Sequence, residues 1–169
     1  YLLLAEWHEW KMPKIAIVTD STSDLPKEIA KKYNITIVPL NVHFGDETLL
    51  DGIDINSNQF FHKLVEWEHH PQTSQPSVGT FLKTYETLLK NYDSILSIHI
   101  SSKLSATYNS ALQASNELSS TNKNITVLDS LTGTVALGAI VTKIAKMNKE
   151  NESMENLIQE SNSLFSKNE

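Results

Sequence analysis

The sequence predicts an α/β fold in which a mostly parallel β-sheet carries helices on both faces. First, short β-branched apolar runs, typical of strands buried on both faces, alternate with longer segments of helical spacing. Second, clusters of Ser, Thr and Asp follow several of these runs, where they favour the start of a helix. Alternating strands and helices imply right-handed crossovers, and therefore a parallel sheet within one α/β domain.

The amino-terminal half is predicted to form two strands, two helices and a hairpin. A strand at 14–19 leads through the capping residues 20–24 into a helix that has Pro26 in its first turn and ends near Lys32. The other elements are a strand at 35–40, in which Pro39 argues against a regular central position, a hairpin within 42–50, and a helix capped by Asn56 or Ser57.

The carboxyl-terminal half is predicted to continue the alternation of helices and strands. Residues 72–77 are expected to form a loop, and Ser101 to Ser105 are expected to cap the helix that follows them. The remaining elements are a helix from Val78 to about Leu89, a strand at 93–100, a strand at 125–128, a helix at 132–147 and a polar helix near 153–165. The apolar run 135–141 is expected to be buried, either in the sheet sandwich or against a second domain or an apolar ligand.

Composition excludes several classes of function. All 14 basic residues among the 169 are lysine and the net charge is −6, which disfavours nucleic-acid binding. The absence of cysteine excludes disulfides, a thiol nucleophile and thiolate zinc sites, and agrees with a cytoplasmic location. No stretch approaches the roughly 18 to 20 apolar residues of a transmembrane helix. Residues 1–11 lack the basic start of a signal peptide, and we expect them to be vector-encoded.

Hydroxyl-rich segments follow the predicted strands at the edge of the sheet where ligands usually bind. These segments favour one modest anion, such as a carboxylate, although helix capping alone also explains each of them. Ser101, Ser102 and Ser105 lack the frame of a nucleophile elbow, and His99 is expected in the core. For Asp20, Asp129 and the pair His69 and His70, capping or loop positions are favoured over a metal site. The segments are 20–24, 73–77, 101–105 and 129–130.

Four of these motifs together resemble the DegV family of bacterial fatty-acid-binding proteins. The motifs are TDSTSDL at 19–25, TSQPS at 73–77, HISSKLSATYNSA at 99–111 and VLDS at 127–130, and the resemblance covers about residues 12–165. It implies a long-chain fatty acid whose carboxylate is held by the hydroxyls of Thr73 and Ser105, without a cofactor, a metal or catalytic residues. Lys103 and Ala106 stand where the family usually has glycine, so Lys103 would strain any turn that needs a positive φ.

The resemblance also implies how the chain is organised and what it does. Family members have two domains, so residues 12–150 are expected to form a DegV-like amino-terminal domain, and 151–169 a helix that leads toward a missing carboxyl-terminal domain. The expected function is fatty-acid binding without enzymatic activity, with presentation of the acid to a fatty acid kinase partner. The alternative is a small serine-dependent hydrolase or transferase that uses the serine-rich edge of the sheet.

Overall fold

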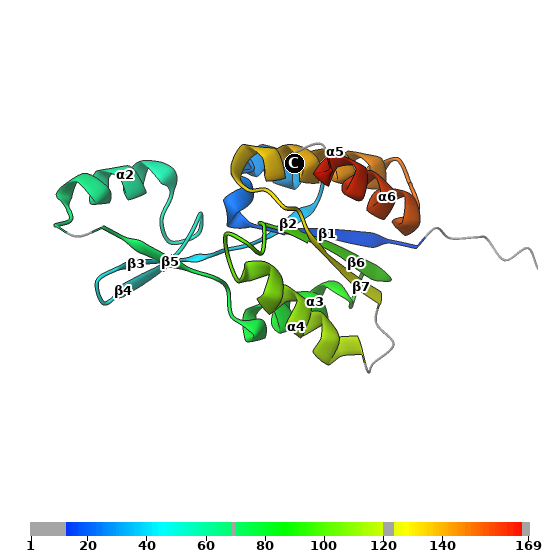
Figure 1. The fold of residues 1–169 in the computed structure, drawn as a ribbon, viewed down its shortest axis with the longest axis horizontal. Helices are drawn as coiled ribbons and strands as arrows, with labels where there is room; N and C mark the ends of the chain where they lie inside the picture. Colours follow the sequence, from blue (N-terminus) through cyan, green and yellow to red (C-terminus); the bar gives the residue numbers. More distant parts are fainter. Residues whose placement is uncertain (1–12, 69, 120–123, 167–169) are drawn as a thin grey trace, which may run out of the picture.

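The computed structural model describes residues 13–68, 70–119 and 124–166. Four strands form a parallel sheet in the order β2-β1-β6-β7, and three further strands form a separate sheet in the order β4-β3-β5 (Figure 1). The strands are β1 (Ile15–Asp20), β2 (Ile35–Val38), β3 (Asn41–Phe44), β4 (Glu47–Leu50), β5 (Gln72–Ser74), β6 (Ser94–His99) and β7 (Asn124–Asp129).

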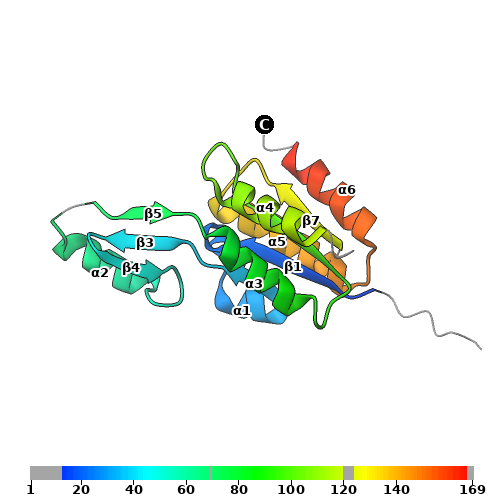
Figure 2. The same cartoon turned by 90° about the horizontal axis from the view of Figure 1, so that it is seen from below.

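Helices cover both faces of the parallel sheet, which confirms the predicted fold class (Figures 1 and 2). The layer with α1, α5 and α6 packs on one face and the layer with α3 and α4 on the other. The helices are α1 (Lys27–Lys32), α2 (Ser57–Glu66), α3 (Val78–Leu88), α4 (Thr107–Ser119), α5 (Thr134–Lys149) and α6 (Met154–Phe165), and a 3-10 turn, η1 (Ser21–Ser23), follows β1.

Strand β1 explains why the sheet needs both layers. Every residue of β1 is buried, and its side chains alternate between the two faces. Ile15 and Ile17 pack in the core under α5 and α6, whereas Ala16 and Val18 pack in the core under α3 and α4. A continuous apolar run is therefore what a central strand of a doubly covered sheet requires.

Local chemistry sets one boundary in each of two predicted elements, the end of a strand and the start of a helix. Strand β2 ends at Val38, directly before Pro39, which cannot donate a ladder hydrogen bond. At the start of α2, Asn56 accepts the N–H of Gln59 at 3.0 Å and the Gln59 side chain accepts the N–H of Asn56 at 2.9 Å. This reciprocal pair is a capping box and confirms the predicted helix start.

The small antiparallel sheet extends from one end of the parallel sheet and has a core of its own (Figure 1). The hairpin predicted within 42–50 forms β3 and β4, and Val42, Phe44 and Ile55 are buried beneath α2. The prediction of a loop over 72–77 is wrong for its first half, because Gln72 to Ser74 form β5 and pair antiparallel with β3. No helix in the described parts of the chain is long and apolar enough to cross a bilayer.

Candidate functional site

The strand order creates a switch point at the carboxyl edge of the parallel sheet. From β1 the chain crosses to β2 on one side, and from β6, which lies on the other side of β1, it crosses outward to β7. Such a switch point leaves a crevice between the loops that follow the two central strands, where ligands of open α/β sheets bind. Here those loops begin at Asp20 and at Ile100.

Asp20 links the two loops from a buried position. Its Oδ1 accepts the N–H of Thr22 at 3.1 Å, and its Oδ2 accepts the N–H of Ile100 at 3.0 Å and lies 2.9 Å from Nδ1 of His99. Burial alone would raise the pKa of the Asp20 carboxyl, but the bonds with His99, Thr22 and Ile100 outweigh burial and hold that pKa below its usual value. The ionised carboxylate therefore serves as a structural acceptor, as the predicted capping position requires.

The Asp20–His99 pair continues into a buried chain of polar side chains. Nε2 of His99 lies 2.7 Å from the hydroxyl of Ser97, which also accepts the hydroxyl of Tyr85 at 2.9 Å. Burial raises the pKa of Tyr85, so its phenol remains a donor. Ser97 and His99 have no exposed surface, which confirms His99 as a core residue and leaves this Ser–His–Asp series out of reach of a substrate.

The segment Ser101–Ser105 forms a tight turn rather than the start of a helix. The carbonyl of Ser101 accepts the N–H groups of Leu104 at 2.9 Å and Ser105 at 3.1 Å, and α4 begins only at Thr107. The predicted helix start is therefore confirmed only at Ser105, whose hydroxyl accepts the N–H of Thr107, while the residues before it form a separate turn. Lys103 is not among the described residues with a positive φ, so the turn accepts a lysine without backbone strain.

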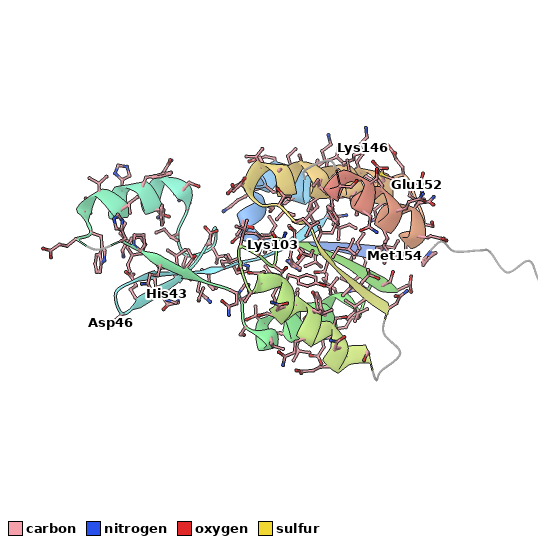
Figure 3. The ribbon with its side chains drawn as sticks, viewed as in Figure 1. His43, Asp46, Lys103, Lys146, Glu152 and Met154 are labelled. Atoms are coloured by element: carbon pink, nitrogen blue, oxygen red, sulfur yellow. The ribbon has the colours of Figure 1, made fainter. Side chains whose placement is uncertain are left out.

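The Lys103 side chain is exposed at the end of the parallel sheet from which the small sheet extends (Figure 3). Ser105 lies two residues further on and is partly buried. Its hydroxyl is 2.9 Å from the hydroxyl of Thr107 and accepts the N–H of Thr107 at 3.3 Å. When Thr107 donates its hydroxyl proton to Ser105, the proton of Ser105 is free to bond an incoming acceptor.

Thr73 lies on β5 with an exposed side chain. It pairs with Val42 and therefore shares the face of the small sheet whose core lies beneath α2. Its hydroxyl makes no hydrogen bond to any residue that the structure describes. The neighbouring Ser74 differs, because its hydroxyl accepts Nδ2 of Asn41 at 3.1 Å and lies 2.8 Å from Nε2 of His43, which ties β5 to β3.

No hydrogen bond joins Thr73 to Ser105 within the described residues, and neither residue lines the cleft at the carboxyl edge. This cleft of about 750 Å³ lies between the loop before α2 and the starts of α1 and α5. Its walls combine the apolar residues Leu25, Ile37, Ile53 and Val135 with the charged residues Asp24, Lys27 and Asp51. The sequence did not indicate this cleft, because its walls come from four segments that are distant along the chain and meet only in the folded structure.

Within the apolar run 135–141, Leu137, Gly138, Ile140 and Val141 are buried in the sheet sandwich as predicted, whereas Val135 is 73% exposed, so for Val135 the alternative of a second domain or an apolar ligand stays a prediction. A second groove of about 400 Å³ lies at the opposite, amino edge of the sheet, between Tyr92 and Met154. Met154 and Glu152 mark that edge in Figure 3, far from Lys103. Hydroxyl-bearing turns and the larger cleft thus share the carboxyl edge.

Together, the doubly covered parallel sheet and the hydroxyl-bearing turns at its carboxyl edge define an α/β domain of the open, switch-point type. A family model described as "uncharacterised protein, DegV family" matches residues 14–169. The chain belongs to the DegV family.

Known relatives agree with this assignment. The chain is 40% identical over 149 residues to a DegV domain-containing protein of Clostridium perfringens, covering 88% of this chain and 53% of the relative. A DegV domain-containing 15.5 kDa protein of Staphylococcus aureus is 41% identical over 136 residues, covering 80% of this chain and 94% of that protein. The chain thus spans about half the length of several curated relatives and nearly all of a shorter one.

Solved structures show the same fold. A structure described as DegV, a fatty acid binding protein from Bacillus subtilis, superposes with a TM-score of 0.85 at 34% identity, covering 91% of this chain and 54% of that one. A DegV family protein from Thermus thermophilus, described by its fatty acid binding, gives a TM-score of 0.82 at 34% identity, with coverages of 90% and 54%.

Proposed function

We propose that this chain binds a long-chain fatty acid and holds its carboxylate with the hydroxyls of Thr73 and Ser105. The observation that carries the proposal is that both side chains can offer a hydroxyl proton. Thr73 is exposed and has no hydrogen-bond partner in the described residues, and Ser105 can take a proton from Thr107 and give its own away. Hydrogen bonds to a charged carboxylate belong to the stronger class, so two hydroxyls suit this ligand.

Apolar surface at the same edge supports an acyl chain as the rest of the ligand. Leu104 and Val135 are more than two-thirds exposed, and the cleft that Val135 lines is large enough for a ligand of this size. Each methylene that leaves water contributes about 0.8 kcal/mol, so most of the affinity comes from the chain rather than from the carboxylate. The relatives described as binding fatty acids support the same ligand class.

We propose a carrier rather than an enzyme, located in the cytoplasm. A serine hydrolase requires an accessible nucleophile beside a base, and the described Ser97–His99 pair is buried. Ser74 lies 2.8 Å from Nε2 of His43, but Nδ1 of that histidine faces the hydroxyl of Thr48 and not a carboxylate. In line with the resemblance, residues 12–150 would form the amino-terminal domain, and 151–169 would lead toward a further domain that completes the acyl tunnel. The half-length chain alone would then bind its ligand weakly.

We further propose that the bound acid is presented to a fatty acid kinase partner. The resemblance alone supports this step. Its test is to mix the chain, loaded with fatty acid, with a candidate kinase and ATP and to measure acyl phosphate. Product formation that depends on the chain is expected, and kinase activity that is indifferent to the chain would contradict the partnership.

Binding is tested by titrating dodecanoate, ¹³C-labelled at its carboxyl, into the chain and following the label by NMR, which detects weak binding. Ser105→Ala and Thr73→Val should each weaken binding by about tenfold, because each removes one hydrogen bond to a charged group. Ser119→Ala is the matched control, since Ser119 ends the helix that Ser105 precedes, and within the described residues its hydroxyl donates to the local carbonyl of Asn116. Neither Ser105→Ala nor Thr73→Val should change the affinity for dodecanol, which has no carboxylate. Negligible effects at both Thr73 and Ser105 would remove the assignment.

A further inference from the structure

The carboxylate of Asp129 reaches from the end of β7 to the turn that precedes α4. Asp129 pairs in register with His99, so the two strands end side by side. Both of its carboxylate oxygens accept the backbone N–H of Ser102, each at 3.2 Å, and Oδ1 also accepts the N–H of Leu131 at 3.0 Å. One side chain therefore joins the loop after β7 to the turn Ser101–Ser105.

The N–H that Asp129 accepts belongs to the same planar peptide group as the carbonyl of Ser101. That carbonyl points the other way and accepts the N–H groups of Leu104 and Ser105. Because the peptide group moves as a unit, the carboxylate that fixes one end of it also fixes the other. The backbone of Ser105 is thus linked to Asp129 through a single rigid peptide.

Neighbouring backbone contacts do not replace this link. The N–H of Ser101 donates to the carbonyl of Thr132 at 2.8 Å, and the N–H of Ser130 donates to the carbonyl of His99 at 3.0 Å. The first bond fixes the peptide group just before Ser101, and the second fixes the peptide group that follows His99. Neither of them fixes the peptide group between Ser101 and Ser102. An ionised acceptor also makes a stronger bond to an N–H than a neutral one does.

We propose that Asp129 is a positioning residue for ligand binding, which holds the Ser101–Ser102 peptide and thereby the hydroxyl of Ser105 in place for a carboxylate. The inference rests on the proposed function, in which Ser105 is a hydrogen-bond donor to the ligand. Asp129 acts through the turn, since its own oxygens face the N–H groups of Ser102 and Leu131.

The test is a double-mutant cycle on dodecanoate binding, read by the same carboxyl label. Asp129→Ala should weaken binding by about tenfold in the wild-type chain but by less than about twofold in a Ser105→Ala background, because the two residues act as one unit. Asp129→Asn keeps one acceptor oxygen and should stay within about twofold of wild type. If Asp129→Ala does not fold, Asp129→Ser enters the same cycle.

Asp93→Ala is the matched control, because Asp93 accepts a backbone N–H, that of Lys14 at 2.7 Å, at the opposite edge of the sheet. It should leave the affinity for dodecanoate unchanged. A wild-type chain that binds dodecanoate no better than dodecanol would overturn the proposed function and this inference with it. If Ser105→Ala weakens binding but Asp129→Ala does not, or weakens it equally in both backgrounds, this inference alone is overturned.

Discussion

The two edges of the parallel sheet are built from similar contacts but differ in what they leave available. At the amino edge, polar groups close on one another: Asp93 accepts the N–H of Lys14, and Asn148 donates to the carbonyl of Ile15 at 3.0 Å. At the carboxyl edge, Asp20 and Asp129 hold turns that keep hydroxyl groups and apolar side chains exposed. The same hydrogen-bond chemistry thus ties down one edge and presents a surface at the other.

Backbone strain follows the same division. The amino-edge turns place Asn34 and Asn151 at positive φ, which asparagine adopts at little cost. At the carboxyl edge the corresponding residues include Leu131 at φ 57° and Thr134 at φ 53°, residue types that are uncommon there. Strain that surrounding structure must hold in place concentrates at functional sites, which supports the carboxyl edge as the binding edge.

The largest effect is expected from Asp20→Asn. The amide would place an N–H₂ group at one of the two oxygen positions, against either Thr22 or the pair His99 and Ile100, so the free energy of unfolding should fall by about 3 kcal/mol near neutral pH. Asp93→Asn, the exposed counterpart at the amino edge, should cost less than about 1 kcal/mol. Urea denaturation of both variants measures the difference.

The stabilisation that Asp20 provides should depend on pH. Because the folded pKa of Asp20 lies below its unfolded value, near 3.9, its contribution to stability is complete above that value and is lost as the pH falls through the folded pKa. The gap in unfolding free energy between wild type and Asp20→Asn should therefore narrow from neutral to acid pH. A constant or widening gap would show that the carboxylate is not the stabilised form.

An intermediate effect is expected from Gly138→Ala in α5. A Cβ at Gly138 would overlap the carbonyl oxygen of Ser23, so η1 and α5 would have to separate, at a cost of about 2 kcal/mol. Gly79→Ala in α3 is the control: its Cβ would meet nothing nearer than the Ser77 hydroxyl at 3.7 Å, and the variant should gain up to about 0.5 kcal/mol. Equal melting temperatures for the two variants would contradict the close packing at the carboxyl edge.

The smallest effect is expected from relieving backbone strain. Leu131→Gly should raise the unfolding free energy by about 1 kcal/mol because glycine adopts a positive φ freely. Asn151→Gly should change it by no more than a few tenths, since asparagine already tolerates that conformation. Thermal denaturation compares the pair, and a larger gain at Asn151 than at Leu131 would reverse the proposed distribution of strain.

The parallel sheet was predictable from the sequence because its signals are local. The run at 14–19 and the cap at Asn56 each specify an element through neighbouring residues alone, and the structure agrees at both. The strand β5 was not predictable, because Gln72 to Ser74 have no apolar alternation and become a strand only by pairing with β3. The link from Asp129 to Ser102 likewise depends on two strands ending side by side.

Candidate site residues were found from the sequence only as hydroxyls near predicted helix starts. The sequence placed Ser105 correctly at this edge and next to a helix start. The turn before it was not predictable, because the bonds from Leu104 and Ser105 to the carbonyl of Ser101 are backbone features without a residue signature. Val135 was singled out only as part of the apolar run 135–141, and Ile53 carries no signal, since the two residues line the cleft together only after the chain has folded.

A crystal structure of the chain soaked with dodecanoate would test the central claim most directly. We expect the carboxylate to lie at the carboxyl edge, with its oxygens about 2.6 to 3.0 Å from the hydroxyls of Thr73 and Ser105. A carboxylate bound instead in the amino-edge groove between Tyr92 and Met154, with both hydroxyls unengaged, would contradict it.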